Sequence, residues 1–275
     1  MTHSAGASEW LNDEGGPVAG AEGVRFGFFT DTSVCIGCKA CEVACKEWNG
    51  VPDNPVNFSG NSYDNTLDLG ANAWRHVAFI EQPAARDGAD FSWLMASDVC
   101  KHCTAAPCLD VCPTGAIFNT EFATVVIQDD VCNGCGYCVT ACPYGVIERR
   151  ETDGGAHKCT LCYDRLKGGQ QPACAQACPT DSIQFGPLDE LLARAGDRVE
   201  QVVAAGHASA QLYGADANGV GGNGAFFLLL DDPEVYGLPP DPVSPTRHLA
   251  ASWRAAGVAA LTLLAGVAAA FGNRR

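Results

Sequence analysis

Residues 132–143 read Cys-Asn-Gly-Cys-Gly-Tyr-Cys-Val-Thr-Ala-Cys-Pro, and the rest of the chain is organised around them. Its spacing, C-x2-C-x2-C-x3-C-P, is that of proteins that hold iron–sulfur cubanes. Three cysteines within seven residues let one loop surround a corner of a cubane, and Gly134 and Gly136 permit the turns that this loop needs. In proteins with two clusters the fourth cysteine binds the neighbouring cluster, so one such run implies a partner run in the same chain.

The sixteen cysteines fall into four sets of four along the chain. In order they are the first set (Cys35, Cys38, Cys41, Cys45), the second (Cys100, Cys103, Cys108, Cys112), the third (Cys132, Cys135, Cys138, Cys142) and the fourth (Cys159, Cys162, Cys174, Cys178). Disulfides do not suit cysteines three residues apart, because the geometry is poor and the closed loop is short. Structural zinc, the second alternative, would leave the third cysteine of each C-x2-C-x2-C without a role. Four [4Fe-4S] clusters use all sixteen thiolates.

Exchange of the fourth cysteine predicts which sets share clusters. The second and third sets are separated by nineteen residues, so they should exchange, and the first and fourth sets pair by elimination. The predicted ligands are group 1 (Cys35, Cys38, Cys41, Cys178), group 2 (Cys45, Cys159, Cys162, Cys174), group 3 (Cys100, Cys103, Cys108, Cys142) and group 4 (Cys112, Cys132, Cys135, Cys138).

The pairing predicts an α+β fold with two bacterial-ferredoxin-like dicluster units, one nested inside the other. The predicted segments are an N-terminal arm (1–23), an outer unit in two pieces (24–97 and 150–238), an inner unit (98–149), a linker (239–248) and a transmembrane helix (249–271). Alternating or apolar runs predict strands at 24–30, 76–81, 183–185 and 225–230 and a hairpin at 116–118 and 125–127. Helices are expected after the first set, through Trp48, and at 187–206.

Several side chains beside the cysteines have two interpretations. Basic groups could raise cluster potentials or merely neutralise cluster charge. These groups are Lys39, Lys46, Lys101, His102, Lys158 and Arg165. Nearby aromatic residues are expected to pack in the core rather than to relay electrons. They are Trp48, Tyr137, Tyr144 and Tyr163.

The C-terminal segment predicts a membrane anchor. Residues 255–271 contain no charge, and at about 1.5 Å per residue they would span roughly 25 Å, slightly less than the bilayer core of about 30 Å. Extension back to Leu249 supplies the missing length, with Arg254 snorkelling to the interface. A buried Ala-rich helix is the alternative.

Charge and terminal composition exclude other classes. The net charge of −15 argues against a nucleic-acid partner. The first twenty residues have neither a basic nor an apolar region, so we expect no export signal on this chain. The glycine-rich residues 219–224 precede a strand rather than a helix, which predicts a turn and not a nucleotide site.

With these motifs the sequence resembles the four-cluster iron–sulfur subunits of molybdenum or tungsten bis-pterin oxidoreductases, and most of all the beta subunit of membrane-bound formate dehydrogenase. The resemblance covers 24–187. Its motifs are C-I-G-C-K-A-C-E-V-A-C-K-E-W-N at 35–49, C-K-H-C-x4-C at 100–108, the run at 132–143, and K-C-T-L-C-Y-D-R with P-A-C-A-Q-A-C-P-T within 158–180.

The resemblance implies an electron-transfer subunit with four [4Fe-4S] clusters and no catalytic site of its own. It would relay electrons between a molybdopterin catalytic alpha subunit and a membrane gamma subunit that binds quinone or haem. The anchor predicts attachment to the cytoplasmic membrane by one helix, and the compact arginine pair at 274–275 slightly favours a cytoplasmic C-terminus, with the cluster domain on the outer face. The resemblance then implies export with a partner that carries a twin-arginine signal. The alternatives are a dimethyl sulfoxide, polysulfide or thiosulfate type of reductase subunit and a free-standing polyferredoxin.

Overall fold

The computed structural model describes residues 10–18, 21, 23–54, 60, 63–64, 66–82, 91–217 and 219–272. Its helices are α1 (Ala40–Asn49), α2 (Pro107–Asp110), α3 (Tyr137–Ala141), α4 (Tyr163–Lys167), α5 (Ala173–Gln176), α6 (Leu188–Ala204) and α7 (Leu249–Gly272). Its strands are β1 (Phe26–Asp31), β2 (Arg75–Gln82), β3 (Ser92–Val99), β4 (Ile117–Asn119), β5 (Val125–Ile127), β6 (Glu148–Arg149), β7 (Ala156–His157), β8 (Ile183–Pro187), β9 (Gln211–Tyr213) and β10 (Ala225–Leu229). Short 3-10 turns are η1 (Thr32–Val34) and η2 (Pro233–Tyr236).

The central sheet joins strands from distant parts of the chain in the order β8-β1-β10-β9. β1 runs antiparallel to β8 and parallel to β10, and every residue of β1 and β10 is buried. Burial on both faces accounts for the continuous apolar run of β10, which would alternate on a half-exposed sheet. The strands predicted at 24–30, 183–185 and 225–230 are therefore confirmed, and β9 is an addition that the sequence pattern did not indicate.

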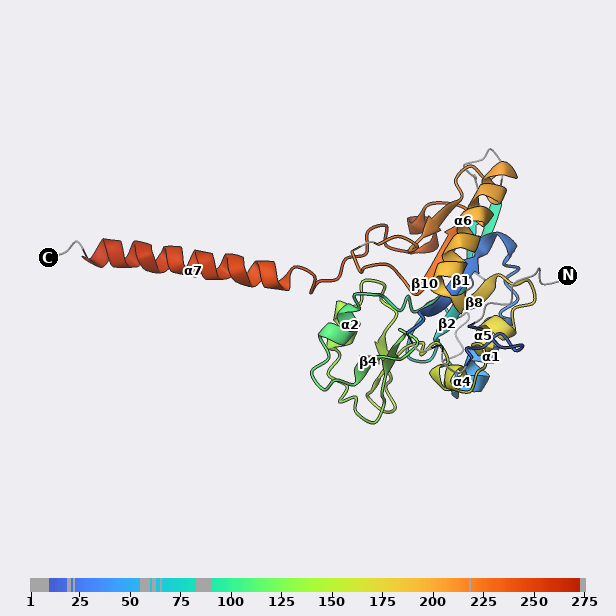
Figure 1. Cartoon of the computed structure of the whole chain (residues 1–275), viewed down its shortest axis with the longest axis horizontal. Helices are drawn as coiled ribbons and strands as arrows, with labels where there is room; N and C mark the ends of the chain where they lie inside the picture. Colours follow the sequence, from blue (N-terminus) through green and yellow to red (C-terminus); the bar gives the residue numbers. More distant parts are fainter. Residues whose placement is uncertain are drawn as a thin grey trace.

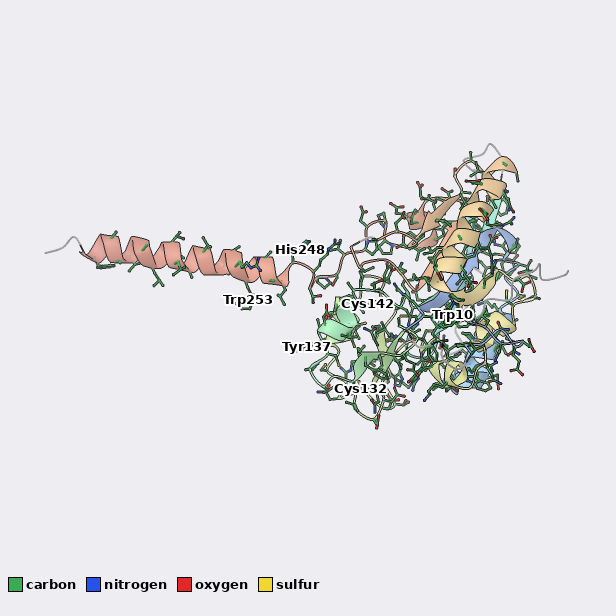
Figure 2. The ribbon with its side chains drawn as sticks, in the orientation of Figure 1. Trp10, Cys132, Tyr137, Cys142, His248 and Trp253 are labelled. Atoms are coloured by element: carbon green, nitrogen blue, oxygen red, sulfur yellow. The ribbon has the colours of Figure 1, made fainter. Side chains whose placement is uncertain are left out.

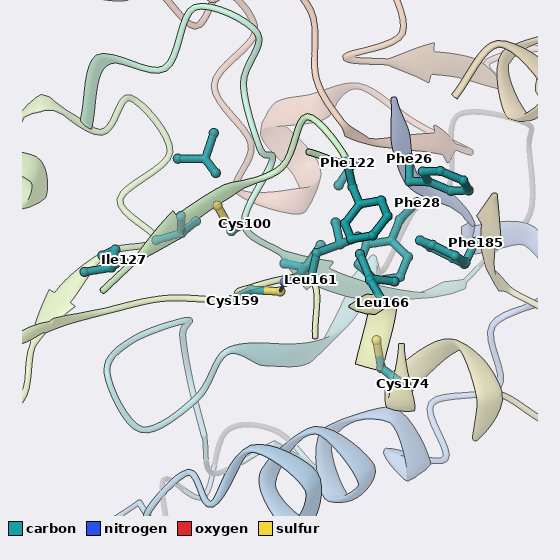
Figure 3. Close-up of a cluster of buried hydrophobic side chains, with 14 of the residues drawn as sticks. Phe26, Phe28, Cys100, Phe122, Ile127, Cys159, Leu161, Leu166, Cys174 and Phe185 are labelled. Atoms are coloured by element: carbon teal, nitrogen blue, oxygen red, sulfur yellow. Dashed lines mark hydrogen bonds between the residues drawn. The ribbon is translucent and has the colours of Figure 1, made fainter. Parts of the chain in front are cut away.

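Phenylalanines on the two faces of β1 belong to two separate hydrophobic clusters. Phe29 packs with Leu191 and Val202 of α6. On the opposite face, Phe26 and Phe28 gather with Phe122 and Phe185, beside Leu161 and Leu166 (Figure 3). Each fully buried large apolar side chain contributes about 2 kcal/mol, so both clusters stabilise the sheet at its centre.

Helix α6 matches the expectation for 187–206 closely. Asp189 and Glu190 lie in its first turn, where their charge favours the helix dipole. Figure 1 shows α6 lying along β1 and β8 in the globular body.

The other strands form separate two-stranded sheets: β2-β3, β4-β5 and β6-β7. The hairpin expected at 116–118 and 125–127 is confirmed as β4 and β5. β2 was expected, but its partner β3 was missed because Ala96, Ser97 and Asp98 do not alternate apolar with polar residues. Pairing along the whole length of β2, from Arg75 opposite Val99 to Gln82 opposite Ser92, forms this strand.

The described part of the N-terminal arm packs on the body. Trp10 and Leu11 lie against the main core, and Ala21 is buried. The side chain of Asn12 donates a hydrogen bond to the Gly169 carbonyl. Residues 1–9, 19, 20 and 22 of the predicted arm lie outside the described residues.

Helix α7 projects from the globular body, with Trp253 near its first turns (Figures 1 and 2). Its 24 residues span about 36 Å, longer than a bilayer core of about 30 Å. None of its residues is buried, so the alternative of a core helix is wrong. Among the described residues α7 is the one helix long and apolar enough to cross a membrane.

Candidate metal centres

The first set shows how a cysteine loop continues into a helix. Cys35 and Cys38 lie on an irregular loop, whereas Cys41 and Cys45 lie four residues apart on the buried face of α1. Lys39 caps α1 in the left-handed conformation (φ 59°). Gly136 (φ 79°) and Cys162 (φ 50°) play the same part before α3 and α4. Left-handed residues at these positions change the direction of the chain just before each helix begins.

The cysteine loops contain several non-glycine residues with strained, left-handed backbone. His102, Leu161 and Cys162 have positive φ angles although they carry side chains. Such backbone costs of order 1–3 kcal/mol each and persists where surrounding structure or a ligand holds it. The third loop relieves strain with glycine: a Cβ on Gly134 would lie 2.3 Å from the Gly154 carbonyl oxygen, so no other residue fits.

Three cavities are each lined by four cysteines from two different sets. The first is lined by Cys35, Cys38, Cys41 and Cys178, the second by Cys100, Cys103, Cys108 and Cys142, and the third by Cys112, Cys132, Cys135 and Cys138. These are the cysteines of groups 1, 3 and 4. Whether they bind clusters together stays a prediction.

Group 2 is brought together by α1 and α5. The Asn49 side chain lies 3.7 Å from the sulfurs of both Cys45 and Cys162, so one amide donates toward both. Burial raises the pKa of Cys45, and the nearby sulfurs of Cys159, Cys174 and Cys162 raise it further. The four sulfurs of this group therefore lie close together as well. Asn49 was missed in the sequence, although its position four residues after Cys45 on α1 is a usable signal.

The donor set suits a bound metal cluster rather than free thiols. Burial raises the pKa of Cys41, Cys108 and Cys159 to about 12 and that of Cys138 to about 11. Such sulfurs stay protonated at neutral pH unless a metal takes the place of the proton. Among the described residues no three Cys, His, Asp or Glu side chains converge closely enough to hold a single ion.

Buried cations accompany these sulfurs. Lys101 and Lys158 are only 1% and 2% exposed. Their positive charges would balance the negative charge of a cluster bound by four thiolates. Burial alone would lower the pKa of Lys158, but the sulfurs of Cys100, Cys108, Cys159 and Cys142 raise it overall. Arg75, which the sequence reasoning did not select, is 2% exposed. The sequence feature that could have identified Arg75 is its position: it is a charged residue directly before the predicted apolar strand 76–81.

Other predicted basic residues have ordinary partners. Lys39 forms ion pairs with Glu42 and Asp64. Lys46 donates to the carbonyl of Pro52 at 2.8 Å and to that of Asn72. For these two lysines, local neutralisation and packing account for what the structure shows.

Two buried donors next to the cysteines have no partner among the described residues. Val125 N donates to His102 Nδ1 at 3.1 Å, and burial lowers the pKa of this imidazole well below its usual value. A neutral ring that accepts at Nδ1 carries its proton on Nε2, which is buried and unpaired within the described residues. His102 lines the cavity of group 3, and Arg75 Nε, beside group 2, is unpaired in the same way. The inorganic sulfides of a bound cluster would accept hydrogen bonds from such donors.

Two aromatic residues lie elsewhere than expected. Trp48 is 44% exposed and Tyr137 is 60% exposed, so the expectation that they pack in the core is wrong for both. Trp48 donates from Nε1 to Asp164 and lies under the Arg165 guanidinium, 4.2 Å from its ring centre. Figure 2 shows Tyr137 on the outer edge of the body, in the region of Cys132 and Cys142.

Comparison with known proteins shows the family of the cysteine-rich part of the chain. Two family models, both described as a 4Fe-4S dicluster domain, match residues 34–116 and 91–188. The formate dehydrogenase iron–sulfur subunit of Haemophilus influenzae is 41% identical over 230 residues, which cover 82% of this chain and 72% of that protein.

Two further relatives define the breadth of the similarity. The iron–sulfur subunit of the nitrate-inducible formate dehydrogenase of Escherichia coli is 42% identical over 216 residues, or 77% of this chain and 71% of that protein. The B subunit of the anaerobic dimethyl sulfoxide reductase of E. coli is 37% identical over 173 residues, or 63% and 78%. By the extent of these matches, this protein belongs to the family of formate dehydrogenase iron–sulfur subunits.

Proposed function

We propose that this chain relays electrons through four [4Fe-4S] clusters, between a molybdenum or tungsten pterin catalytic subunit that oxidises formate and a membrane subunit that binds quinone or haem. Family membership supports the formate partner. The observation that carries the proposal is that the sixteen sulfurs lie in four separate groups of four, each drawn from two sets. A cubane supplies the one-electron step, and the chain holds and insulates it.

We assign groups 1 to 4 as the ligands of clusters 1 to 4. Electrostatic effects between the sulfurs of different groups support a linear order. Beside the dominant effect of burial, Cys174 of group 2 raises the pKa of Cys41 in group 1, and Cys100 of group 3 raises that of Cys159 in group 2. In the same way Cys138 of group 4 acts on Cys108 of group 3. Neighbouring groups thus lie within electrostatic range, in the order 1-2-3-4, which suits a relay.

The same proposal divides the chain into an inner unit, 98–149, nested in an outer unit made of 24–97 and 150–238. The central sheet supports it, because β1 precedes the inner unit while β8, β9 and β10 follow it. The hairpin β4-β5 of the inner unit forms a sheet of its own.

We propose that α7 anchors the chain in the cytoplasmic membrane by a single pass. Arg247 and Arg254 precede the apolar part and two arginines follow it at 274–275, so the count of positive charges is balanced. Because Arg254 lies at the edge of the apolar run and the closing pair is compact, a cytoplasmic C-terminus is slightly favoured. The clusters then face outward, after export with a partner that carries a twin-arginine signal. Protease treatment of cells without their wall tests this: cleavage of the cluster domain before lysis is expected, and protection until lysis would reverse the orientation.

A subunit of a dimethyl sulfoxide type of reductase is the second candidate, favoured by the 37% identity to the B subunit of that enzyme. One experiment separates the two. The full-length chain, purified anaerobically with its companions, should contain about sixteen irons and sixteen sulfides. Formate should then reduce its clusters. Reoxidation by dimethyl sulfoxide, without reduction by formate, would assign the chain to the second class, and zinc in place of iron would refute both.

A further inference from the structure

A chain of polar contacts links a sulfur of group 1 to a sulfur of group 2. Arg75 Nη2 donates to Cys174 Sγ at 3.2 Å. Arg75 Nη1 donates to the Ser97 carbonyl at 3.2 Å and lies 3.4 Å from Ser97 Oγ. Ser97 Oγ in turn lies 3.3 Å from Cys41 Sγ. One guanidinium and one hydroxyl therefore connect the two predicted cluster sites.

The hairpin β2-β3 creates this link. Arg75 pairs with Val99 and Val77 pairs with Ser97, so Arg75 and Ser97 are diagonal neighbours on one face of the hairpin. Cys41 reaches them from α1, and Cys174 from α5.

Hydrogen-bond chemistry sets the polarity of the link. A guanidinium has donors and no acceptor, so Ser97 Oγ accepts from Arg75. The hydroxyl hydrogen of Ser97 is then free to point at Cys41 Sγ. A thiolate bound to iron can only accept, so the link donates into both sulfurs.

The charge of Arg75 has no carboxylate partner in the described part of the chain. Instead its guanidinium lies 4.8 Å from the ring centre of Phe28. A guanidinium keeps its proton in proteins, and that of Arg75 donates directly to Cys174 Sγ and lies one hydroxyl away from Cys41 Sγ. A fixed positive charge thus sits between groups 1 and 2, and the sulfurs are its counter-charge.

We propose that Arg75, assisted by Ser97, is a positioning residue that sets the reduction potentials of clusters 1 and 2 together. This inference rests on the proposed function, because it needs a cluster in each group. Hydrogen bonds and positive charge near the sulfurs stabilise the reduced, more negative cluster and raise its potential. Arg75 would keep its proton and charge in either redox state of the two clusters. Because one cation acts on both clusters, its removal should lower both potentials.

Potentiometric titration followed by electron paramagnetic resonance tests the proposal in the full-length chain with its companions. Arg75→Met should lower two of the four midpoint potentials and leave two unchanged. The expected size is at least about tenfold in the ratio of reduced to oxidised cluster, or 59 mV for a one-electron couple. Arg75→Lys keeps the charge and should lower the same two potentials less. Arg194→Met, which removes an equal charge from an exposed position bonded to Gln184, should change none.

Ser97→Ala provides a second variant that leaves the guanidinium in place. It removes the donor to Cys41 and one of the acceptors of Arg75, whose bonds to the Ser97 carbonyl and to Cys174 Sγ remain. It should therefore lower one potential, and that one should be among the two that Arg75→Met lowers. If Arg75→Met does not assemble its clusters, this variant decides: a single lowered potential supports the proposal, and four unchanged potentials overturn it.

Other outcomes also decide. A variant Arg75→Met with about sixteen irons and four unchanged potentials would overturn the proposal. So would an equal shift of all four potentials, or an equal effect of Arg75→Lys and Arg75→Met. If the chain without substitutions contained no iron, the proposed function would be refuted. Metal content thus tests the proposed function, and the potentials test the role of Arg75.

Discussion

Gly27 of β1 lies against Gly224, so closely that a Cβ on Gly27 would stand 2.1 Å from the Gly224 carbonyl oxygen. The same oxygen accepts a hydrogen bond of 2.8 Å from Phe28 N, and Gly224 N donates to the carbonyl of Lys101 at 2.8 Å. The contact therefore ties the central sheet to the backbone of the second cysteine set.

Substitution Gly27→Ala should destabilise the fold by about 3 kcal/mol, because the backbone of residue 224 must move and no flexible side chain can give way. The midpoint of urea-induced loss of visible cluster absorbance measures this. Gly196→Ala is the matched control: it lies inside α6 with open space around it, so the same change should stabilise by about 0.5–1 kcal/mol. Equal midpoints for both variants would show that the contact carries no strain.

Cys142→Ser should damage the cluster of group 3 more than that of group 4. Cys142 belongs to the third set in sequence, yet it lines the cavity of Cys100, Cys103 and Cys108. Iron content should fall, and the spectrum should lose the signal that a Cys103→Ser variant also loses. Loss of the signal shared with Cys135→Ser would contradict the exchange of ligands between sets.

Lys158→Met should lower the potentials of clusters 2 and 3, by the same electrostatic argument applied to a different pair. The Lys158 ammonium donates to the Val125 carbonyl and, at 3.0 Å, to the Cys159 carbonyl, within range of sulfurs from groups 2 and 3. Electron paramagnetic resonance titration should show two lowered potentials, one of them shared with Arg75→Met. Lys167→Met, at an exposed position over the Tyr163 ring, is the control and should lower none. If none of the potentials lowered by Lys158→Met were also lowered by Arg75→Met, the order 1-2-3-4 would be contradicted.

Deletion of 249–275 should leave all four clusters assembled but release the chain from membranes. The physical reason is that α7 buries none of its residues on the globular body, so the core loses no packing. Iron content and the distribution between membrane and soluble fractions measure the two effects. Loss of iron in the truncated chain would mean that the helix supports the fold, and unchanged membrane binding would assign the attachment to another subunit.

Local patterns were the reliable part of the sequence reasoning. Hairpin β4-β5, helix α6 and strand β10 follow from alternation, helix-end signals and apolar runs within short segments. The weakest inferences concerned the tertiary environment of a residue or strand. Tyr137 was expected in the core and is exposed. Strand β3 was missed because it forms through pairing with β2 rather than through its own sequence pattern.

By itself the sequence determined the cysteine sets, the family and the apolar terminal helix, because ligand spacing and hydrophobic length are local properties of a polypeptide. Only the tertiary structure decided which cations lie between the sets. Arg75 is 34 residues from Cys41 and 99 from Cys174, and no spacing rule connects them. They meet because β2 pairs with β3 and because α1 packs on α5, and such long-range contacts depend on the folded protein as a whole.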